Sequence, residues 1–176
     1  MTIWRHLPAR LQFGAPARIL WGRGRIAVLK WLDMPPVWLA LMLALGFGFD
    51  RVIPGFALGL PGLDIAGLVL IVAGLVAMGG GLFELIRRKT TIIPRERASA
   101  FVTHGIYRLT RNPIYLGDVL VIAGAVLYWD ILPAIFLVPL FVSIITKRFI
   151  EGEEIGLLET FGVEAMDYFA QVRRWI

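Results

Sequence analysis

Cysteine is absent from these 176 residues, and histidine occurs only twice, as His6 and His104. Without thiols the chain can form no disulfide, no thiolate metal site and no cysteine nucleophile. Two histidines do not supply a multi-histidine metal site, so we expect no bound metal. None of these absences identifies the cellular compartment.

Charged residues are also scarce, at 18% of the chain, whereas 58% of the residues are hydrophobic and the mean hydropathy is +0.75. Soluble domains are about 45–50% apolar. A fold of this size cannot bury the excess, because small folds leave a large share of their area exposed. The composition therefore predicts an all-α protein in a lipid bilayer, with residues 1–176 as a single membrane domain.

The first 33 residues are basic and rich in tryptophan and glycine. We expect no secretory signal, since residues 1–30 carry six basic side chains without a long apolar run between them. The segment is predicted to be an interfacial lead-in, where Trp4, Trp21 and Trp31 suit the headgroup level. The net charge of +5 does not indicate a nucleic-acid partner, because no basic run is interleaved with stacking aromatic residues.

Four apolar stretches are candidate transmembrane helices, and they lie at about 35–49, 64–84, 113–129 and 131–146. The first is short for a full crossing, and its far end falls between 49 and 60. In the second, Ala73, Ala77 and Gly81 recur every four residues, which predicts a face for close helix packing.

The last two stretches are joined by a predicted tight turn at Asp130 and Pro133, so they should form an antiparallel helical hairpin. Pro139 predicts a kink in the second arm. Apolar residues then recur at helical spacing among six acids in residues 151–176. This pattern predicts an amphipathic tail helix that lies on the membrane or packs on the core.

The basic residues are distributed unevenly between the predicted loops. Of the 18, six lie in the lead-in, seven in a connector at 84–112, four after the hairpin, and only Arg51 between the first two stretches. Four crossings would place the first three groups on one side, as the positive-inside rule requires. We therefore expect the lead-in, the connector, the tail and both termini in the cytoplasm.

The candidate chemistry lies on that side. In residues 104–118, Asn112 is a suitable cap and Pro113 a suitable first residue for the third helix. A helix start beside Arg108 and Arg111 suits a carboxylate or phosphate ligand. The alternative is an ordinary capped helix whose arginines bind the anionic leaflet.

Three acids accompany this stretch. Asp118 lies one turn inside the third helix, where an ionisable group is costly and often functional, although it could also pair with an arginine at the interface. Glu153 and Glu154 could accept hydrogen bonds from a ribose or an amine, or could simply begin a solvated helix. The hairpin should bring both glutamates to the depth of Arg111. A zwitterionic cosubstrate with an amino-acid head and a nucleoside would fit between two such poles.

The sequence GIYRLTRNPIYLG at residues 105–117 resembles the Arg-His/Asn-Pro-x-Tyr-x-Gly signature of the membrane methyltransferases. That superfamily includes isoprenylcysteine carboxyl methyltransferase and phosphatidylethanolamine N-methyltransferase. The Glu-Glu pair and residues 158–176 resemble its C-terminal block, and Thr90-Thr91 and Pro94 fit the approach to the signature. The resemblance covers about residues 80–176 and implies S-adenosylmethionine as the methyl donor.

The resemblance also implies that the donor pocket is lined by Arg111, Asn112, Tyr115, Gly117, Glu153 and Glu154. We add His104, Tyr107 and Leu116 to the predicted donor-binding residues. The predicted catalytic residues are Arg108, Arg111 and Asp118, with Arg111 at the carboxylate of the donor. Asn112 replaces the histidine of the eukaryotic enzymes and is usual in bacterial-type members, so we expect a bacterial inner-membrane protein.

The methyl acceptor is expected to be a lipid or a small apolar molecule that enters sideways between helices. A carboxylate acceptor would need a cation such as Arg108 or Arg97, an amine would need a base such as Asp118, and a thiol would need little beyond apolar walls. Two other functions stay open. One is an NADPH-dependent sterol-type reductase, which Gly117-Asp118 favours, and the other is a non-catalytic lipid-binding membrane protein. The oligomeric state is open as well.

Overall fold

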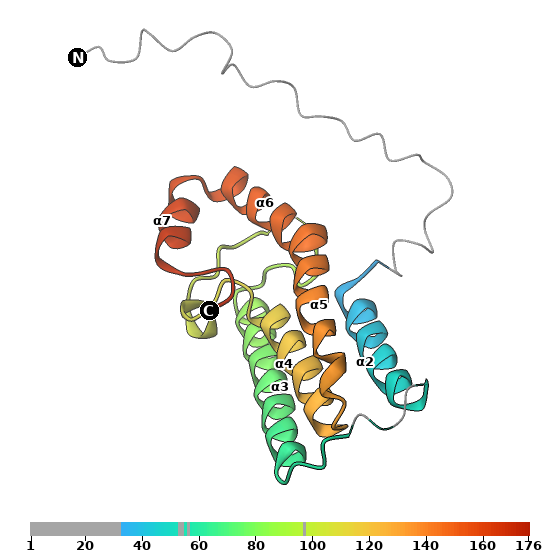
Figure 1. The fold of residues 1–176 in the computed structure, drawn as a ribbon. Coiled ribbons are helices and arrows are strands. Elements are labelled where there is room, and N and C mark those ends of the chain that lie inside the picture. Colours follow the sequence, from blue (N-terminus) through green and yellow to red (C-terminus); the bar gives the residue numbers. More distant parts are fainter. Residues whose placement is uncertain (1–32, 53–54, 56, 97) are drawn as a thin grey trace, which may run out of the picture. The chain divides into compact units, whose positions relative to one another are not determined.

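The structure is a computed structural model that describes residues 33–52, 55, 57–96 and 98–176, so the lead-in lies outside the described residues except for Asp33. The described part is helical and contains no strand, which confirms the all-α prediction. Its main helices, drawn in Figure 1, are α2 (Pro35–Val52), α3 (Leu63–Arg87), α4 (Pro113–Tyr128), α5 (Leu137–Ile145), α6 (Glu151–Phe161) and α7 (Val163–Gln171).

Two of the described helices are long and apolar enough to cross a bilayer. They are α3 and the continuous helical run Leu132–Phe161, which contains α5 and α6. The helices Pro35–Phe49 and Pro113–Tyr128 are apolar but shorter. Large apolar side chains on α3, such as Val69 and Val76, are exposed, as expected for a surface that faces lipid.

The closest helix packing is between α3 and α4, which approach at glycines. A Cβ atom on Gly74 would lie 2.6 Å from the carbonyl oxygen of Gly117, and one on Gly67 would lie 2.6 Å from that of Gly124. Such distances are too short for a real Cβ, so only glycine allows this backbone contact. The predicted small-residue face was therefore misplaced at Ala73, which is exposed.

The correct face of α3 repeats every seven residues, through Gly67, Gly74 and Gly81. A seven-residue repeat keeps one seam turned toward a nearly antiparallel partner over its whole length, as in coiled coils. Ala77 is buried on the same face, which the sequence had assigned correctly.

The other side of α4 packs on α5 and α2 around an apolar core. Met42 of α2, Ile122 of α4, and Phe141 and Ile145 of α5 are almost fully buried there. Pro139 does not interrupt the second arm of the hairpin. It lies in the first turn of α5, directly after the 3-10 turn Leu132–Phe136, within one continuous helical run.

The tail differs from the single predicted amphipathic helix. The hairpin arm passes through a π-helical turn, Thr146–Ile150, directly into α6, and the chain then bends at Gly162 before α7. Gly162 has φ 54° and ψ −119°, a conformation that glycine adopts with little strain. Residues 172–176 leave α7 in an extended conformation and return to the start of α4.

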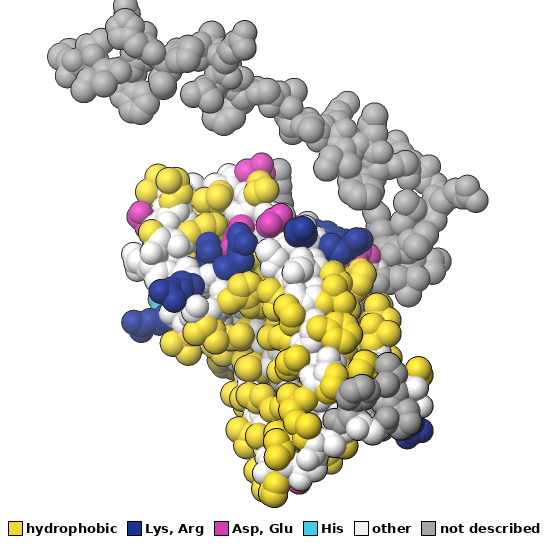
Figure 2. Space-filling view, in the orientation of Figure 1, with side chains coloured by type: hydrophobic (Ala, Val, Ile, Leu, Met, Phe, Trp, Pro, Cys, Tyr) yellow, Lys and Arg dark blue, Asp and Glu magenta, His cyan; other side chains and the backbone are white. Residues whose placement is uncertain are grey.

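Charged side chains gather at one end of this bundle. Figure 2 shows most of the Lys and Arg side chains at the end of the bundle from which α6 and α7 extend, whereas the flank of the bundle is apolar. Among the described residues, Arg51 is the basic side chain of α2, at the last turn of that helix.

Candidate functional site

The candidate site forms where the start of α4 meets the C-terminal segment. Pro113 is the first residue of α4, as predicted, but the side chain of Asn112 makes no capping hydrogen bond. The Asn112 amide nitrogen Nδ2 instead donates to the carbonyl oxygen of Arg174 at 3.0 Å. The Thr110 hydroxyl donates to the same carbonyl at 3.1 Å, and the backbone N–H of Arg111 donates to Arg173 O at 3.0 Å. These bonds hold the C-terminal segment against the signature.

The side chain of Glu154 lies between two arginines. Its Oε1 is 3.3 Å from Nη1 of Arg111, and its Oε2 is 2.5 Å from Nη2 of Arg174. The side chains of Arg111 and Glu154 are only 16% and 12% exposed, so water screens this ion pair weakly. The Arg111 guanidinium also lies over the ring of Phe169, 4.4 Å from its centroid.

The neighbouring glutamate is bound to the signature by a different contact. The hydroxyl of Tyr115 donates to Oε1 of Glu153 at 2.8 Å, and the Tyr115 ring lies against that of Phe149. The two arms of the hairpin thus bring the Arg-Asn-Pro-x-Tyr sequence and the Glu-Glu pair together at one end of the bundle. The predicted poles touch directly and are not separated by a cavity.

Three of the other predicted residues lie in or next to the 3-10 turn that precedes the signature. Arg108, at the end of the 3-10 turn η2 (Gly105–Arg108), is exposed, as is His104 just before the turn. Tyr107 is buried, and its carbonyl oxygen accepts a 2.6 Å hydrogen bond from the hydroxyl of Tyr168. Burial raises the pKa of Tyr168 to about 12, and it raises that of Tyr107 further still. Both phenols therefore remain neutral at physiological pH.

Leu116, Gly117 and Asp118 lie inside α4. Leu116 is partly buried, and Gly117 is the residue that Gly74 approaches, so helix packing alone accounts for a glycine there. Asp118 is only 3% exposed, one helical turn beyond Tyr115. Within the described residues Asp118 forms no ion pair, so it does not pair with an arginine at the interface as the alternative prediction had it.

Three charged residues that make contacts at this end of the bundle were not predicted from the sequence. Arg174 supplies both a carbonyl and a guanidinium, although its block had been noted as part of the resemblance. Asp33 binds Arg95 at 2.8 Å and Arg148 at 2.9 Å. Glu84 of α3 is buried against Gly105, which has φ 60° and where a Cβ would lie 2.5 Å from Glu84 Oε1. A charged residue near the end of an apolar run was the only available signal for Glu84.

The described architecture defines an apolar helical membrane protein whose polar residues converge at one end. The model of the phospholipid methyltransferase family matches residues 63–164, which is more than half of the chain. The chain therefore belongs to this family of membrane methyltransferases. The match includes α3, the signature, the hairpin and both glutamates. Neither the curated proteins nor the solved structures contain a match to the chain.

The site has polar groups suited to the amino-acid head of S-adenosylmethionine. Nε of Arg111 is buried without a hydrogen-bond partner, although the other end of the guanidinium binds Glu154. A buried unpaired N–H is costly, and a carboxylate is its natural partner. Glu153 and Glu154 are the acids close enough to accept from an amine or a ribose hydroxyl. The residues present therefore fit a donor of this chemistry.

Proposed function

We propose that this protein transfers a methyl group from S-adenosylmethionine to a lipid or a small apolar acceptor at the cytoplasmic face of the membrane. The observation that carries the proposal is the convergence of Arg111 with Glu154, and of Tyr115 with Glu153, across the hairpin. The match to the methyltransferase family covers both the signature and the acidic pair, which supports their junction as the place for the donor.

Donor binding would rearrange the contacts seen in the site. The unpaired Nε–H of Arg111 would donate a hydrogen bond to the carboxylate of S-adenosylmethionine. Glu154 and Glu153 would accept hydrogen bonds from its ammonium group or its ribose. Because Arg111 and Glu154 already touch, the donor would have to insert between them or bind at their edge. Asn112, Leu116, Gly117, His104 and Tyr107 complete the predicted set, and of these Asn112 lies nearest, bound to Arg174.

The membrane arrangement belongs to the same proposal. The four membrane crossings would be α2, α3, α4 and the helical run that begins at Leu132. The connector between α3 and α4 and the tail after the hairpin would then lie on the cytoplasmic side. At about 1.5 Å per residue, α2 and α4 are about 24–27 Å long, close to a hydrocarbon core of about 30 Å. The cluster of basic side chains at one end agrees with this orientation. A bacterial inner membrane is the proposed location.

The protein's part in the reaction is alignment and exclusion of water. The bound donor would supply an electrophilic methyl group on sulfur, and holding an acceptor in line can contribute about 7–11 kcal/mol. Arg108 would place the acceptor group if that group is an anion, whereas the buried carboxylate of Asp118 would take the proton if the acceptor is an amine.

Methyl transfer can be tested with purified protein, labelled methyl donor and total membrane lipid. We expect label in the lipid fraction, and we expect calorimetry to show binding of S-adenosylmethionine but not of NADPH. Binding of NADPH alone would assign the hairpin to a reductase. Binding of neither nucleoside, by protein that remains folded in detergent, would favour a purely lipid-binding protein.

A further inference from the structure

The hairpin arm reaches the two glutamates of the candidate site through the π-helical turn Thr146–Ile150. The hydrogen bond that defines this turn runs from the backbone N–H of Glu151 to the carbonyl oxygen of Thr146, five residues earlier. A π turn contains one residue more than an α turn, and each residue rotates a helix by about 100°. If the turn relaxed into an α-helix, α6 would rotate by about that angle, and Glu153 and Glu154 would face away from the signature.

This turn needs support from outside its own helix. π turns are rare, and they occur mostly as single turns inside α-helices, often at functional sites. The hydroxyl of Thr146 is buried and has no hydrogen-bond partner among the described residues, which adds to the free-energy cost of the turn. Contacts from other elements must therefore hold the π-helical turn in place.

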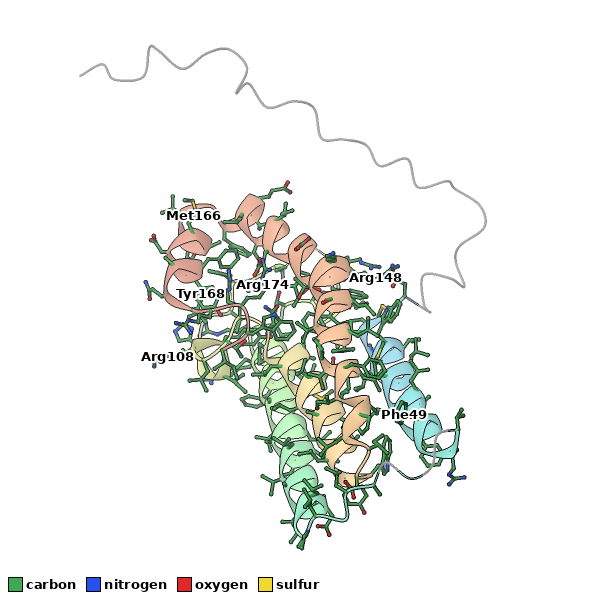
Figure 3. All side chains as sticks on the ribbon, in the orientation of Figure 1. Phe49, Arg108, Arg148, Met166, Tyr168 and Arg174 are labelled. Atoms are coloured by element: carbon green, nitrogen blue, oxygen red, sulfur yellow. The ribbon has the colours of Figure 1, made fainter. Side chains whose placement is uncertain are left out.

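Arg95, in the connector between α3 and η2, makes such contacts. Its Nη2 donates to the carbonyl oxygen of Arg148, inside the turn, at 3.2 Å, and its guanidinium lies 4.3 Å from the centroid of the Phe149 ring. The same Nη2 donates to Oδ2 of Asp33 at 2.8 Å, and Asp33 Oδ1 accepts from Nε of Arg148 at 3.0 Å. Figure 3 shows Arg148 on the helical run that continues α5, beside the start of α2. The contacts of Arg95 thus converge on the π-helical turn.

The turn connects Arg95 with a predicted donor ligand. The ring of Phe149 lies 6.4 Å from that of Tyr115, centroid to centroid, and the Tyr115 hydroxyl donates to Glu153. The positive charge of Arg95 also acts on the carboxylate of Glu153. Arg95 can therefore influence Glu153 through the residues between them.

The backbone of Arg95 is held in an uncommon conformation. Its φ is 67°, in a region that residues other than glycine seldom adopt. Such strain persists only where surrounding contacts impose it, and it is frequent near functional sites. The connector is also closed at its base, where the hydroxyl of Thr90 accepts from the backbone N–H of Ser99 at 3.1 Å. The connector thus presents Arg95 to the turn from fixed ends.

We propose that Arg95 is a positioning residue of the donor site, and that it holds the π-helical turn in the register that directs Glu153 and Glu154 toward Arg111. The role in donor binding rests on the proposed function, whereas the hold on the turn does not. Without Arg95 the turn would relax and α6 would rotate. The connector therefore controls the donor site although Arg95 does not contact the donor.

The first measurement is the affinity of the full chain in detergent for S-adenosylmethionine. We expect Arg95→Gln to weaken binding about tenfold, as loss of one hydrogen bond between charged groups does. Arg95→Lys keeps the positive charge near Asp33 and Phe149 and should recover part of that loss. Arg88→Gln, which removes an exposed charge elsewhere in the connector, should bind as wild type does.

The second measurement follows the orientation of α6 and needs no donor. Because the chain has no cysteine, spin labels attach only at Arg87→Cys, at the end of α3, and at Ile155→Cys, on α6, both of which are exposed positions. A rotation of about 100° moves a side chain that lies about 5 Å from the helix axis by about 8 Å. We expect a single distance between the labels in the parent protein and with Arg88→Gln, and a second distance with Arg95→Gln.

The two measurements together decide the proposal. An unchanged label distance with Arg95→Gln would overturn it, and a loss of donor affinity in that case would mean that Arg95 contacts the donor itself. A second distance with undiminished donor affinity would overturn it as well, since the orientation of α6 would not matter for binding. A second distance in a protein whose wild type binds no donor would sustain the hold on the turn and refute the methyltransferase assignment.

Discussion

The two sides of α4 are held by opposite means, one by the α3–α4 interface and the other, at the start of the helix, by the charged cluster with α6 and the C-terminal segment. Between α3 and α4 the backbones approach directly at Gly67, Gly74, Gly117 and Gly124. At the end of α4, by contrast, contact depends on Glu154 between two arginines and on hydrogen bonds to the C-terminal segment.

The difference has a physical origin. Lipid provides no hydrophobic drive for two apolar helices to associate, so close van der Waals contact must hold α3 to α4. Near the membrane surface, charged groups can pair and can also exchange partners with a ligand. We infer that the glycine interface is the rigid part of the protein and that the charged cluster is the part that responds to a ligand.

The largest expected effect is at the glycine interface. Gly124→Val would place a Cβ 2.6 Å from Gly67 O, a backbone atom that cannot move aside. Overpacking costs about 1–3 kcal/mol where the structure can relax, and we expect at least the upper end here. Thermal unfolding in detergent would measure the loss. Gly79→Val is the matched control, because no atom lies within 4 Å of a Cβ there. Equal stability of the two variants would show that α3 and α4 are not in backbone contact.

The next effect is on donor binding. Glu154→Gln removes the acid that Arg111 and Arg174 share, and we expect the affinity for S-adenosylmethionine to fall about 10- to 100-fold, the range for a hydrogen bond to a charged group. Calorimetry would measure it. Glu159→Gln, an exposed position on the same helix, should bind as wild type does. If both variants lose affinity for S-adenosylmethionine to the same extent, the charge on α6 matters but the position of Glu154 does not.

A smaller effect is expected at Tyr115. Tyr115→Phe keeps the ring against Phe149 and removes only the 2.8 Å hydrogen bond to Glu153. A single such bond contributes about 0.5–1.5 kcal/mol, so the methyl-transfer rate should fall no more than about tenfold while the protein stays folded. A complete loss of activity would mean that the hydroxyl takes part in the reaction itself.

The smallest effect concerns Asp33 and acid pH. Hydrogen bonds from Arg148, and also from Arg95 and Trp38, hold the pKa of the Asp33 carboxyl well below its usual value of 3.8. A lowered folded-state pKa stabilises the protein above about pH 4 and loses that effect as the pH falls further. The difference in unfolding temperature between wild type and Asp33→Asn should therefore shrink below pH 4. A difference that is independent of pH would exclude an ionic role for Asp33.

Several elements could be predicted from the sequence because local chemistry determines them. Asn112 and Pro113 marked the start of α4, and the hairpin followed from its short turn, where Asp130 has φ 51°. The packing face of α3 was misplaced because small residues occur on more than one face, and only the partner helix decides between Ala73 and Gly74. The tail bend at Gly162 was missed since a glycine within a periodic pattern is compatible with a continuous helix.

The candidate site was predicted in part. The meeting of Arg111 with Glu154 followed from the hairpin, because its arms bring those positions together. The role of Arg174 did not, since it depends on the chain reversing after α7. Long-range returns of this kind are determined by tertiary packing, not by local propensity.

The most direct test of the account is a double-mutant cycle on donor binding with Arg111→Ala, Glu154→Gln and the double variant. If the two side chains form one binding unit for S-adenosylmethionine, the combined loss should differ from the sum of the single losses by about 0.5–3 kcal/mol. Losses that add within error, or single variants that bind the donor as tightly as wild type, would contradict the claim that the donor binds where the signature meets the acidic pair.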